Sequence, residues 1–220
     1  METDPPETPE PILELDGVRF DSFSPRVDLS IGQGQLAFMR SRLVSPWLLG
    51  LRKPLEGEIR FQGKPWDERN VTMLENDRRK IGTVWDARSR RVSAWVANLD
   101  VDENVFLAAD FDSSRRHRSI IEEARELAEQ FGFENGPPSI RAAQASAADL
   151  IRSQWIRAFL VRPMEFLILD NPIEDAPSAS IPELVEKVKE ALDKGVAVLW
   201  AAEYNPPFSE LDLSPDFLLT

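Results

Sequence analysis

Four short, continuously apolar runs constrain the fold of this 220-residue chain more than any other feature of its sequence. They span residues 36–39, 81–85, 166–169 and 196–200, and they are separated by long intervening segments, several with helical periodicity. A strand that is apolar throughout must be covered on both faces, which is typical of parallel sheets connected by helices. The sequence therefore predicts an α/β fold with a mostly parallel core sheet flanked by helices.

A second, antiparallel sheet is predicted near the N-terminus. Apolar and polar residues alternate within residues 12–31, and a similar short strand at 58–63 ends at Gln62-Gly63. Strict alternation with turn residues between the runs is typical of antiparallel strands with one buried face.

Apolar stripes predict three helices, over residues 119–131, 147–161 and 181–194. The third has the clearest boundary signals, because Ser180 and Glu183 have the spacing of a capping box and Pro182 lies in the first turn.

Composition argues against several classes of function. The net charge of −12 argues against nucleic acid as the main partner, since that binding depends on neutralising phosphates. The chain has no cysteine and a single histidine, His117, so neither a disulfide framework, a thiol metal site nor a Ser-His-Asp triad is expected. No apolar run approaches the roughly 18 residues of a membrane span, and no signal-peptide pattern is present. The acidic, proline-rich residues 1–11 predict a disordered tail.

Three basic clusters stand out against this acidic background, at residues 78–80, 88–91 and 115–118. Each is either a solvated surface or a docking site for an acidic partner or anionic lipid headgroups.

Three segments in a fixed order carry a resemblance to a known family. Residues 50–59 read GLRKPLEGEI, residues 99–105 read LDVDENV, and an apolar strand at 166–169 leads into Asp170-Asn171-Pro172. The first is similar to Gly-Leu-x-x-Pro-x-x-Gly-Glu-Ile and the second to Leu-Thr-Val-x-Glu-Asn-Val, two motifs of the ATP-binding subunits of ABC transporters. In order and spacing, the chain resembles that family.

The resemblance covers about residues 12–205 and implies one domain over 12–220. Its expected architecture is a P-loop-NTPase-like ABC cassette with a mostly parallel core sheet, an N-terminal antiparallel β subdomain and a small helical subdomain over about 87–160.

The positions that handle nucleotide in this family depart from its pattern. The stretch at 36–50 has no glycine before its last residue, whereas a phosphate loop needs glycines so that backbone N–H groups can surround phosphate. The family's loop Lys, strand-end Gln, signature Gln, metal-site Asp, general base and switch His fall at Ser41, Asp86, Asp149, Asp170, Asn171 and Glu203, respectively. The amide of Asn171 cannot act as a general base, and the carboxylates of Asp149 and Glu203 repel phosphate.

We therefore expect these six positions to be vestigial, with no catalytic residue and no metal site beyond Asp170 as a remnant. We also expect neither ATP nor Mg²⁺ as a cofactor, and no ATP hydrolysis.

The resemblance then implies a non-catalytic (pseudo-ATPase) cassette subunit at the cytoplasmic, inner face of a membrane. Its expected partners are a membrane permease and a competent ABC ATPase or second cassette subunit. In this family the segment after the strand-end Gln helps to receive the permease, and its candidate interface residues here are Arg88, Arg90, Arg91, Trp95, Asn98, Asp100, Asp102 and Glu103.

Two alternatives remain at this point: a soluble regulatory or interaction module that reuses the fold, and an active ATPase with an atypical site. The run at 98–105 also resembles cassettes that serve lipid-transport permeases.

Overall fold

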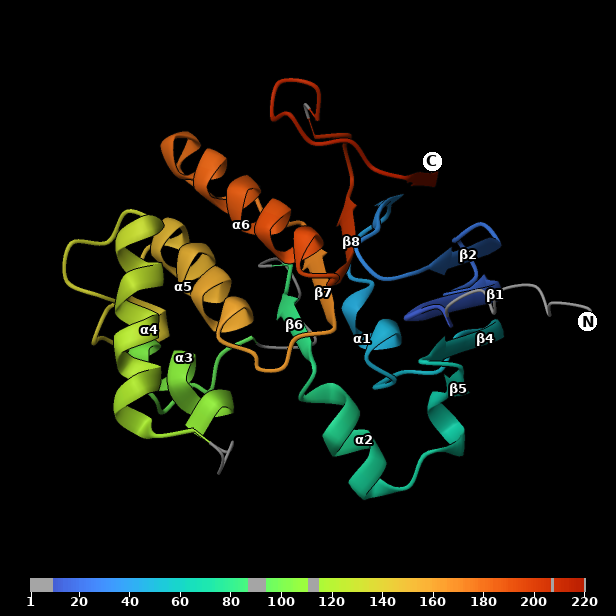
Figure 1. The fold of residues 1–220 in the computed structure, drawn as a ribbon, viewed down its shortest axis with the longest axis horizontal. Coiled ribbons are helices and arrows are strands. Elements are labelled where there is room, and N and C mark those ends of the chain that lie inside the picture. The colour runs from blue at the N-terminus through green and yellow to red at the C-terminus, as the bar shows by residue number, and fades with distance from the viewer. Residues whose placement is uncertain (1–9, 87–93, 111–114, 207, 220) are drawn as a thin grey trace, which may run out of the picture.

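The computed structural model describes residues 10–86, 94–110, 115–206 and 208–219. Within them, two sheets and a group of helices form the fold, with the antiparallel sheet on one side of the parallel sheet and the larger helices on the other (Figure 1). The predicted disordered tail lies mostly outside the described residues, since the description begins at residue 10.

The larger sheet has five parallel strands in the order β6-β7-β8-β3-β9. Its strands are β3 (Leu36–Arg40), β6 (Ile81–Val84), β7 (Phe166–Asp170), β8 (Ala197–Ala202) and β9 (Phe217–Leu219). Four of the five coincide with the apolar runs of the sequence, so the predicted parallel α/β core is confirmed. The edge strand β9 is also apolar, but it is only three residues long and was not predicted.

The smaller sheet is antiparallel, with the order β2-β1-β4-β5. It comprises β1 (Leu13–Arg19), β2 (Val27–Ile31), β4 (Glu56–Phe61) and β5 (Lys64–Pro65). Gly57 has a φ of +76°, and a Cβ built there would lie 2.4 Å from the carbonyl oxygen of Asp16 on the paired strand. This close backbone approach requires a glycine at the start of β4.

Six α-helices are present among the described residues: α1 (Ser45–Leu48), α2 (Val71–Arg78), α3 (Val101–Asp110), α4 (His117–Gln130), α5 (Ala147–Phe159) and α6 (Ile181–Asp193). The last three confirm the predicted helices to within two residues at each end. Helix α2 has no buried side chain, which explains why its sequence carries no apolar stripe. Asn70 caps it by accepting a hydrogen bond of 3.0 Å from the Met73 N–H.

The capping box predicted for α6 is wrong. Ser180 occupies the N-cap position with helical backbone angles, and its side chain makes no capping bond. Its hydroxyl instead donates to the Phe131 carbonyl oxygen at 3.4 Å, because a 3-10 turn at Ser178–Ser180 directly precedes the helix. Pro182 does lie in the first turn, as predicted.

Alternate residues of each parallel strand belong to two separate hydrophobic cores. Phe38, Leu169 and Trp200 pack with helices α3 to α6, whereas Met39 and Ile168 pack with α1 and the antiparallel sheet. This period of two is the geometry of a strand that is covered on both faces. No helix in the described part of the chain combines the length and hydrophobicity needed to cross a bilayer.

Candidate functional site

The carboxyl ends of four parallel strands bring polar side chains together at one edge of the larger sheet. Arg42 follows β3, Asp86 follows β6, Asp170 ends β7 and Glu203 follows β8. In open parallel sheets this edge is where ligands bind, because the loops after the strands can form a crevice there.

Arg42 connects three of these strand ends. Its Nε lies 3.0 Å from Asp86 Oδ2, its Nη1 lies 3.0 Å from Glu203 Oε2, and its Nη2 lies 3.9 Å from Glu174 Oε2. The Asp86 side chain is completely buried, whereas a quarter of the Arg42 side chain is exposed. The hydrogen bond to Asp86 raises the pKa of Arg42, so this guanidinium stays charged. One cation therefore sits among three carboxylates that would otherwise repel one another.

Asp170 accepts three hydrogen bonds from the loop that leads into α1. Its Oδ1 accepts from the Leu43 N–H at 2.9 Å, and its Oδ2 accepts from the Ser45 N–H at 3.1 Å and the Ser45 hydroxyl at 2.9 Å. Leu43 has a φ of 59°, a left-handed conformation that is unfavourable for a branched side chain. Burial raises the pKa of Asp170 to about 6, against the opposing effect of the Ser45 and Leu43 hydrogen bonds.

The remaining predicted positions make more local contacts. The Ser41 N–H donates to the Met39 carbonyl oxygen at 2.9 Å, and the Asn171 amide donates to Glu174. Asp149 lies at the start of α5, where its N–H donates to Ser146 Oγ at 3.0 Å and its carboxylate pairs with Arg152 at 2.6 Å. The structure thus gathers Asp86, Asp170 and Glu203 around the loop after β3, while the contacts of Asp149 stay on its own helix.

The edge in this arrangement does not fit Mg²⁺ and a triphosphate. Both oxygens of Asp170 are engaged by the protein, and Arg42 is already paired with carboxylates. Over the ranges that the structure describes, no group of three or more His, Cys, Asp or Glu side chains is arranged to hold a metal ion. A nucleotide would have to displace these contacts.

Sequence reasoning missed three residues of this edge. Arg42, Ser45 and Glu174 make the ion pairs and hydrogen bonds just described, but none carries a recognisable motif. The available signal was charge balance, since acidic residues follow three of the apolar runs and arginines, Arg40 and Arg42, follow the run at 36–39.

The predicted partner-interface residues lie on and before α3. Arg88, Arg90 and Arg91 lie outside the described residues. Asn98 is exposed, and its carbonyl oxygen accepts from Arg141. The guanidinium of Arg157 lies over the ring of Trp95, and its Cζ is 5.1 Å from the ring centroid.

The three acidic candidates at the start of α3 stabilise the chain locally. Asp100 pairs with Arg141 at 3.2 Å, and the Glu103 carboxylate accepts from the Asp100 N–H at 2.7 Å, as in half of a capping box. Asp102 accepts from the Ser139 hydroxyl at 2.6 Å. These contacts give each carboxylate a structural role, and their proposed role at an interface stays a prediction.

No family model matches the chain. Among curated proteins, it is similar to the nickel import ATP-binding protein NikE of Brucella abortus, with 27% identity over 187 residues. That match covers 79% of this chain and 66% of the relative, just under two thirds of the relative's length.

Solved structures of low sequence identity share the fold. An ATP-binding subunit of an ABC transporter has a TM-score of 0.73 at 18% identity, covering 94% of this chain and 85% of that one. The cassette MJ0796, in a post-hydrolysis dimer bound to ADP and Pi, has a TM-score of 0.69 at 20% identity, with 87% and 88% covered. The protein cbiO1 from Clostridium perfringens, part of the transporter complex cbiONQ, has a TM-score of 0.60 at 18% identity, with 89% and 79% covered.

These findings confirm the resemblance: the chain has the fold of the ATP-binding cassettes of ABC transporters. They also correct two expectations. The predictions that the chain is not an enzyme and takes neither ATP nor Mg²⁺ are contradicted, because its relative is an ATP-binding protein and one structural neighbour was captured after hydrolysis with ADP and Pi. Loss of motif residues alone was not sufficient ground for those predictions.

Proposed function

We propose that the chain is the cassette subunit of a membrane transporter and docks on a permease from the inner face of the membrane. The observation that carries this proposal is the cassette fold, together with a curated relative that is an import ATP-binding protein and a neighbour that is part of a transporter complex. A second cassette subunit would complete the transporter.

The segment before α3 supports the docking part of the proposal. Trp95 is only partly buried and Val96, Ala97 and Asn98 are exposed, so this turn offers an aromatic and small apolar surface. Asn104 fixes the turn from inside, accepting from the Val96 N–H at 2.7 Å and donating to the carbonyl oxygens of Val96, Leu99 and Asp100. A surface held rigid by a buried side chain loses little entropy when a partner binds.

The relatives, rather than the geometry of the edge, support the use of nucleotide. We propose that ATP binds at the carboxyl edge of the larger sheet after the contacts of Asp170 and Arg42 open. The similarity of residues 98–105 to lipid-transport cassettes stays a prediction.

Co-purification tests the docking proposal. The tagged chain is co-expressed with a candidate membrane permease and isolated in mild detergent. Recovery of a stoichiometric complex supports the proposal. Recovery of the chain alone, with the permease present in the extract, contradicts it and favours a soluble regulatory module.

A further inference from the structure

The carboxyl edge of the larger sheet contains an arginine whose three side-chain nitrogens all face carboxylates. Arg42 lies 3.0 Å from Asp86, 3.0 Å from Glu203 and 3.9 Å from Glu174, and we call these four residues the Arg42 cluster. The contacts connect the loop after β3 with the segments that follow β6, β7 and β8. Because ligands of open parallel sheets bind at this edge, the cluster occupies space that a ligand would need.

The backbone beside the cluster is engaged as well. The Leu43 N–H, the Ser45 N–H and the Ser45 hydroxyl all donate to Asp170, at 2.9, 3.1 and 2.9 Å. These donors are therefore already used by the protein. An incoming phosphate would meet neither a free Arg42 guanidinium nor these three donors in the loop after β3.

The two sets of contacts act on consecutive residues. Arg42 is held through its side chain, and Leu43 is held through its backbone N–H. Leu43 has a φ of 59°, and a branched residue keeps such a conformation only where the surrounding contacts impose it. Loss of the Arg42 contacts should therefore release the turn at Leu43 too, so that the loop opens as a unit.

The three carboxylates of the cluster contribute unequally. The Asp86 side chain is fully enclosed, whereas those of Glu174 and Glu203 are 27% and 49% exposed. Removal of one partner from an enclosed pair is strongly unfavourable, whereas exposed pairs contribute little. Asp86 should therefore set most of the cost of opening, while Glu174 and Glu203 add negative charge that repels phosphate.

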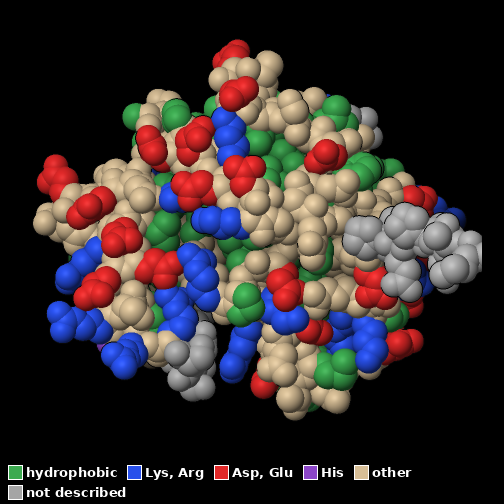
Figure 2. Space-filling model, in the orientation of Figure 1, with side chains coloured by type: hydrophobic (Ala, Val, Ile, Leu, Met, Phe, Trp, Pro, Cys, Tyr) green, Lys and Arg blue, Asp and Glu red, His purple; other side chains and the backbone are tan. Residues whose placement is uncertain are grey.

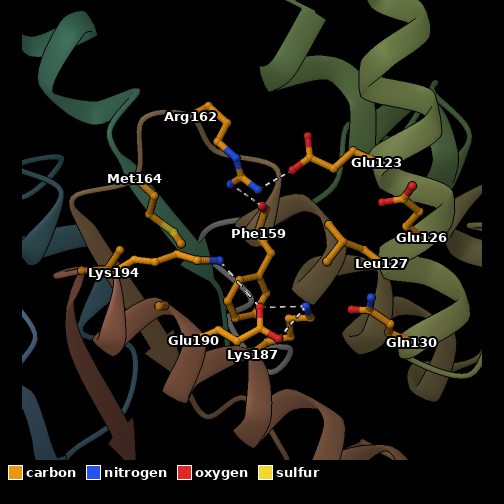
Figure 3. A pocket seen from close by; sticks show the side chains of 12 residues that line it. Glu123, Glu126, Leu127, Gln130, Phe159, Arg162, Met164, Lys187, Glu190 and Lys194 are labelled. Carbon is orange, nitrogen blue, oxygen red and sulfur yellow. Dashed lines mark hydrogen bonds and ion pairs between the residues drawn. The ribbon is translucent and has the colours of Figure 1, made fainter.

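Ion pairs elsewhere on the surface are of a different kind. Figure 2 shows acidic and basic side chains interspersed over the helices α4 to α6, and Arg118 and Glu122 of α4 form a pair with 91% and 59% of their side chains exposed. A cavity of about 500 Å³ between α4 and α6 has similar pairs, in which Glu190 contacts Lys187 and Lys194 (Figure 3). These pairs connect residues of one helix or its end, whereas Arg42 connects to carboxylates 44 and 161 residues away along the chain.

We propose that the Arg42 cluster is an autoinhibitory contact, which holds the loop after β3 in its closed arrangement and competes with nucleotide for the carboxyl edge. This inference rests on the proposed use of nucleotide and names what limits the affinity for it. The disagreement between the closed edge and a bound Mg·ATP then has a physical cause, because the closed state is the one in which Arg42 takes the place of a ligand.

Mg·ATP binding to the full chain tests the inference. Isothermal titration calorimetry compares wild type with the double variant Arg42→Gln/Asp86→Asn. This variant loses one positive and one negative charge, so the net charge of the edge is unchanged while the contact is removed. An apparent dissociation constant is the intrinsic constant divided by the fraction of molecules that are open. The double variant should therefore bind Mg·ATP about 10-fold more tightly than wild type.

Two matched variants separate this contact from general electrostatics. Glu203→Asp keeps the negative charge but shortens the side chain by one methylene, which lengthens the 3.0 Å contact with Arg42. It should tighten binding about 2-fold, as expected for an exposed pair. Arg118→Gln/Glu122→Gln removes an exposed ion pair from α4 and should leave the dissociation constant within about 1.5-fold of wild type.

Amide hydrogen exchange of the nucleotide-free chain gives a readout that does not involve ATP. The Leu43 and Ser45 N–H groups donate to Asp170, so their exchange reports opening of the loop. Exchange over residues 41–45 should be about 10-fold faster in the double variant, with exchange in α4 unchanged. Circular dichroism checks that the double variant is folded; if it is not, Glu203→Asp decides the outcome alone.

Three results would overturn the inference. If wild type binds Mg·ATP as tightly as the double variant or more tightly, Arg42 does not compete with nucleotide, and the proposal that nucleotide binds still stands. Unchanged exchange over residues 41–45 would show that the cluster does not hold the loop. Absence of binding in wild type and the double variant alike would reject nucleotide at this edge and the inference with it, while co-purification still decides the docking proposal.

Discussion

The ion pair between Arg42 and Asp86 is expected to stabilise the carboxyl edge far more than the pair between Arg42 and Glu203. All three residues meet at similar distances, 3.0 Å for each pair, so geometry does not separate them. Burial does, because the Asp86 side chain is fully enclosed and the Glu203 side chain is 49% exposed.

The expected magnitudes follow from that difference. Removing one partner of a buried pair costs about 3–5 kcal/mol, and the partial exposure of Arg42 reduces this to about 2–3 kcal/mol for Arg42→Gln. The coupling energy between Arg42 and Asp86, from a double-mutant cycle with Asp86→Asn, should be about 1.5 kcal/mol. The same cycle with Glu203→Gln should give less than about 0.5 kcal/mol, as for other exposed pairs.

Urea denaturation followed by tryptophan fluorescence measures these free energies of unfolding. Repeating both cycles in about 0.5 M salt adds a control, because screening should reduce the Glu203 coupling and leave most of the Asp86 coupling. Equal coupling energies for the two pairs, or an Asp86 coupling that disappears with salt, would refute the reasoning from burial.

Three further predictions concern Asp170, nucleotide and the start of α5. Between its ordinary pKa of 3.8 and its raised value of about 6, Asp170 holds a proton in the folded but not in the unfolded chain. The free energy of unfolding of wild type minus that of Asp170→Asn should therefore fall by about 2.4 kcal/mol as the pH rises from 4 to 7, and a constant difference in urea titrations would contradict this. Mg·ATP at about ten times its dissociation constant should stabilise the chain by about 1.4 kcal/mol and raise its Tm by about 4 °C in differential scanning fluorimetry. No shift at millimolar Mg·ATP, with wild type folded, would reject nucleotide binding. Ser146→Ala removes the cap that accepts from the Asp149 N–H and should lower stability by about 1 kcal/mol, which urea denaturation can check against Ser214→Ala at an exposed position.

The sequence was sufficient for the parallel sheet and its main helices because their signals are local. A continuous apolar run or a 3.6-residue stripe determines which faces are buried, whichever elements cover them. Helix α2 lacks such a pattern because it buries no side chain, and the apolar run of β9 is only three residues long. The pairing of β9 with β3 is a tertiary contact that a single sequence does not display.

For the candidate site, the sequence located the strand-end positions but not their interactions. Asp86, Asp170 and Glu203 were identified as vestigial nucleotide-site positions, and the structure brings them together at one edge of the sheet. Arg42 was not identified, because its role depends on carboxylates that lie 44 and 161 residues away along the chain. The prediction that nucleotide is absent failed for a different reason, since it treated missing motif residues as equivalent to a missing ligand.

The division of the strands between two cores has a consequence for how this chain tolerates change. Neighbours in sequence, such as Ile168 and Leu169, are buried in different cores and touch different sets of residues. Residues far apart in sequence, such as Phe38, Trp200 and Phe208, are in ring contact, with centroids 5.3 Å apart for Phe38–Phe208 and 5.8 Å for Trp200–Phe208. Substitutions should therefore compensate across the sheet within one core, so that covariation among relatives follows every second residue of a strand rather than adjacent positions.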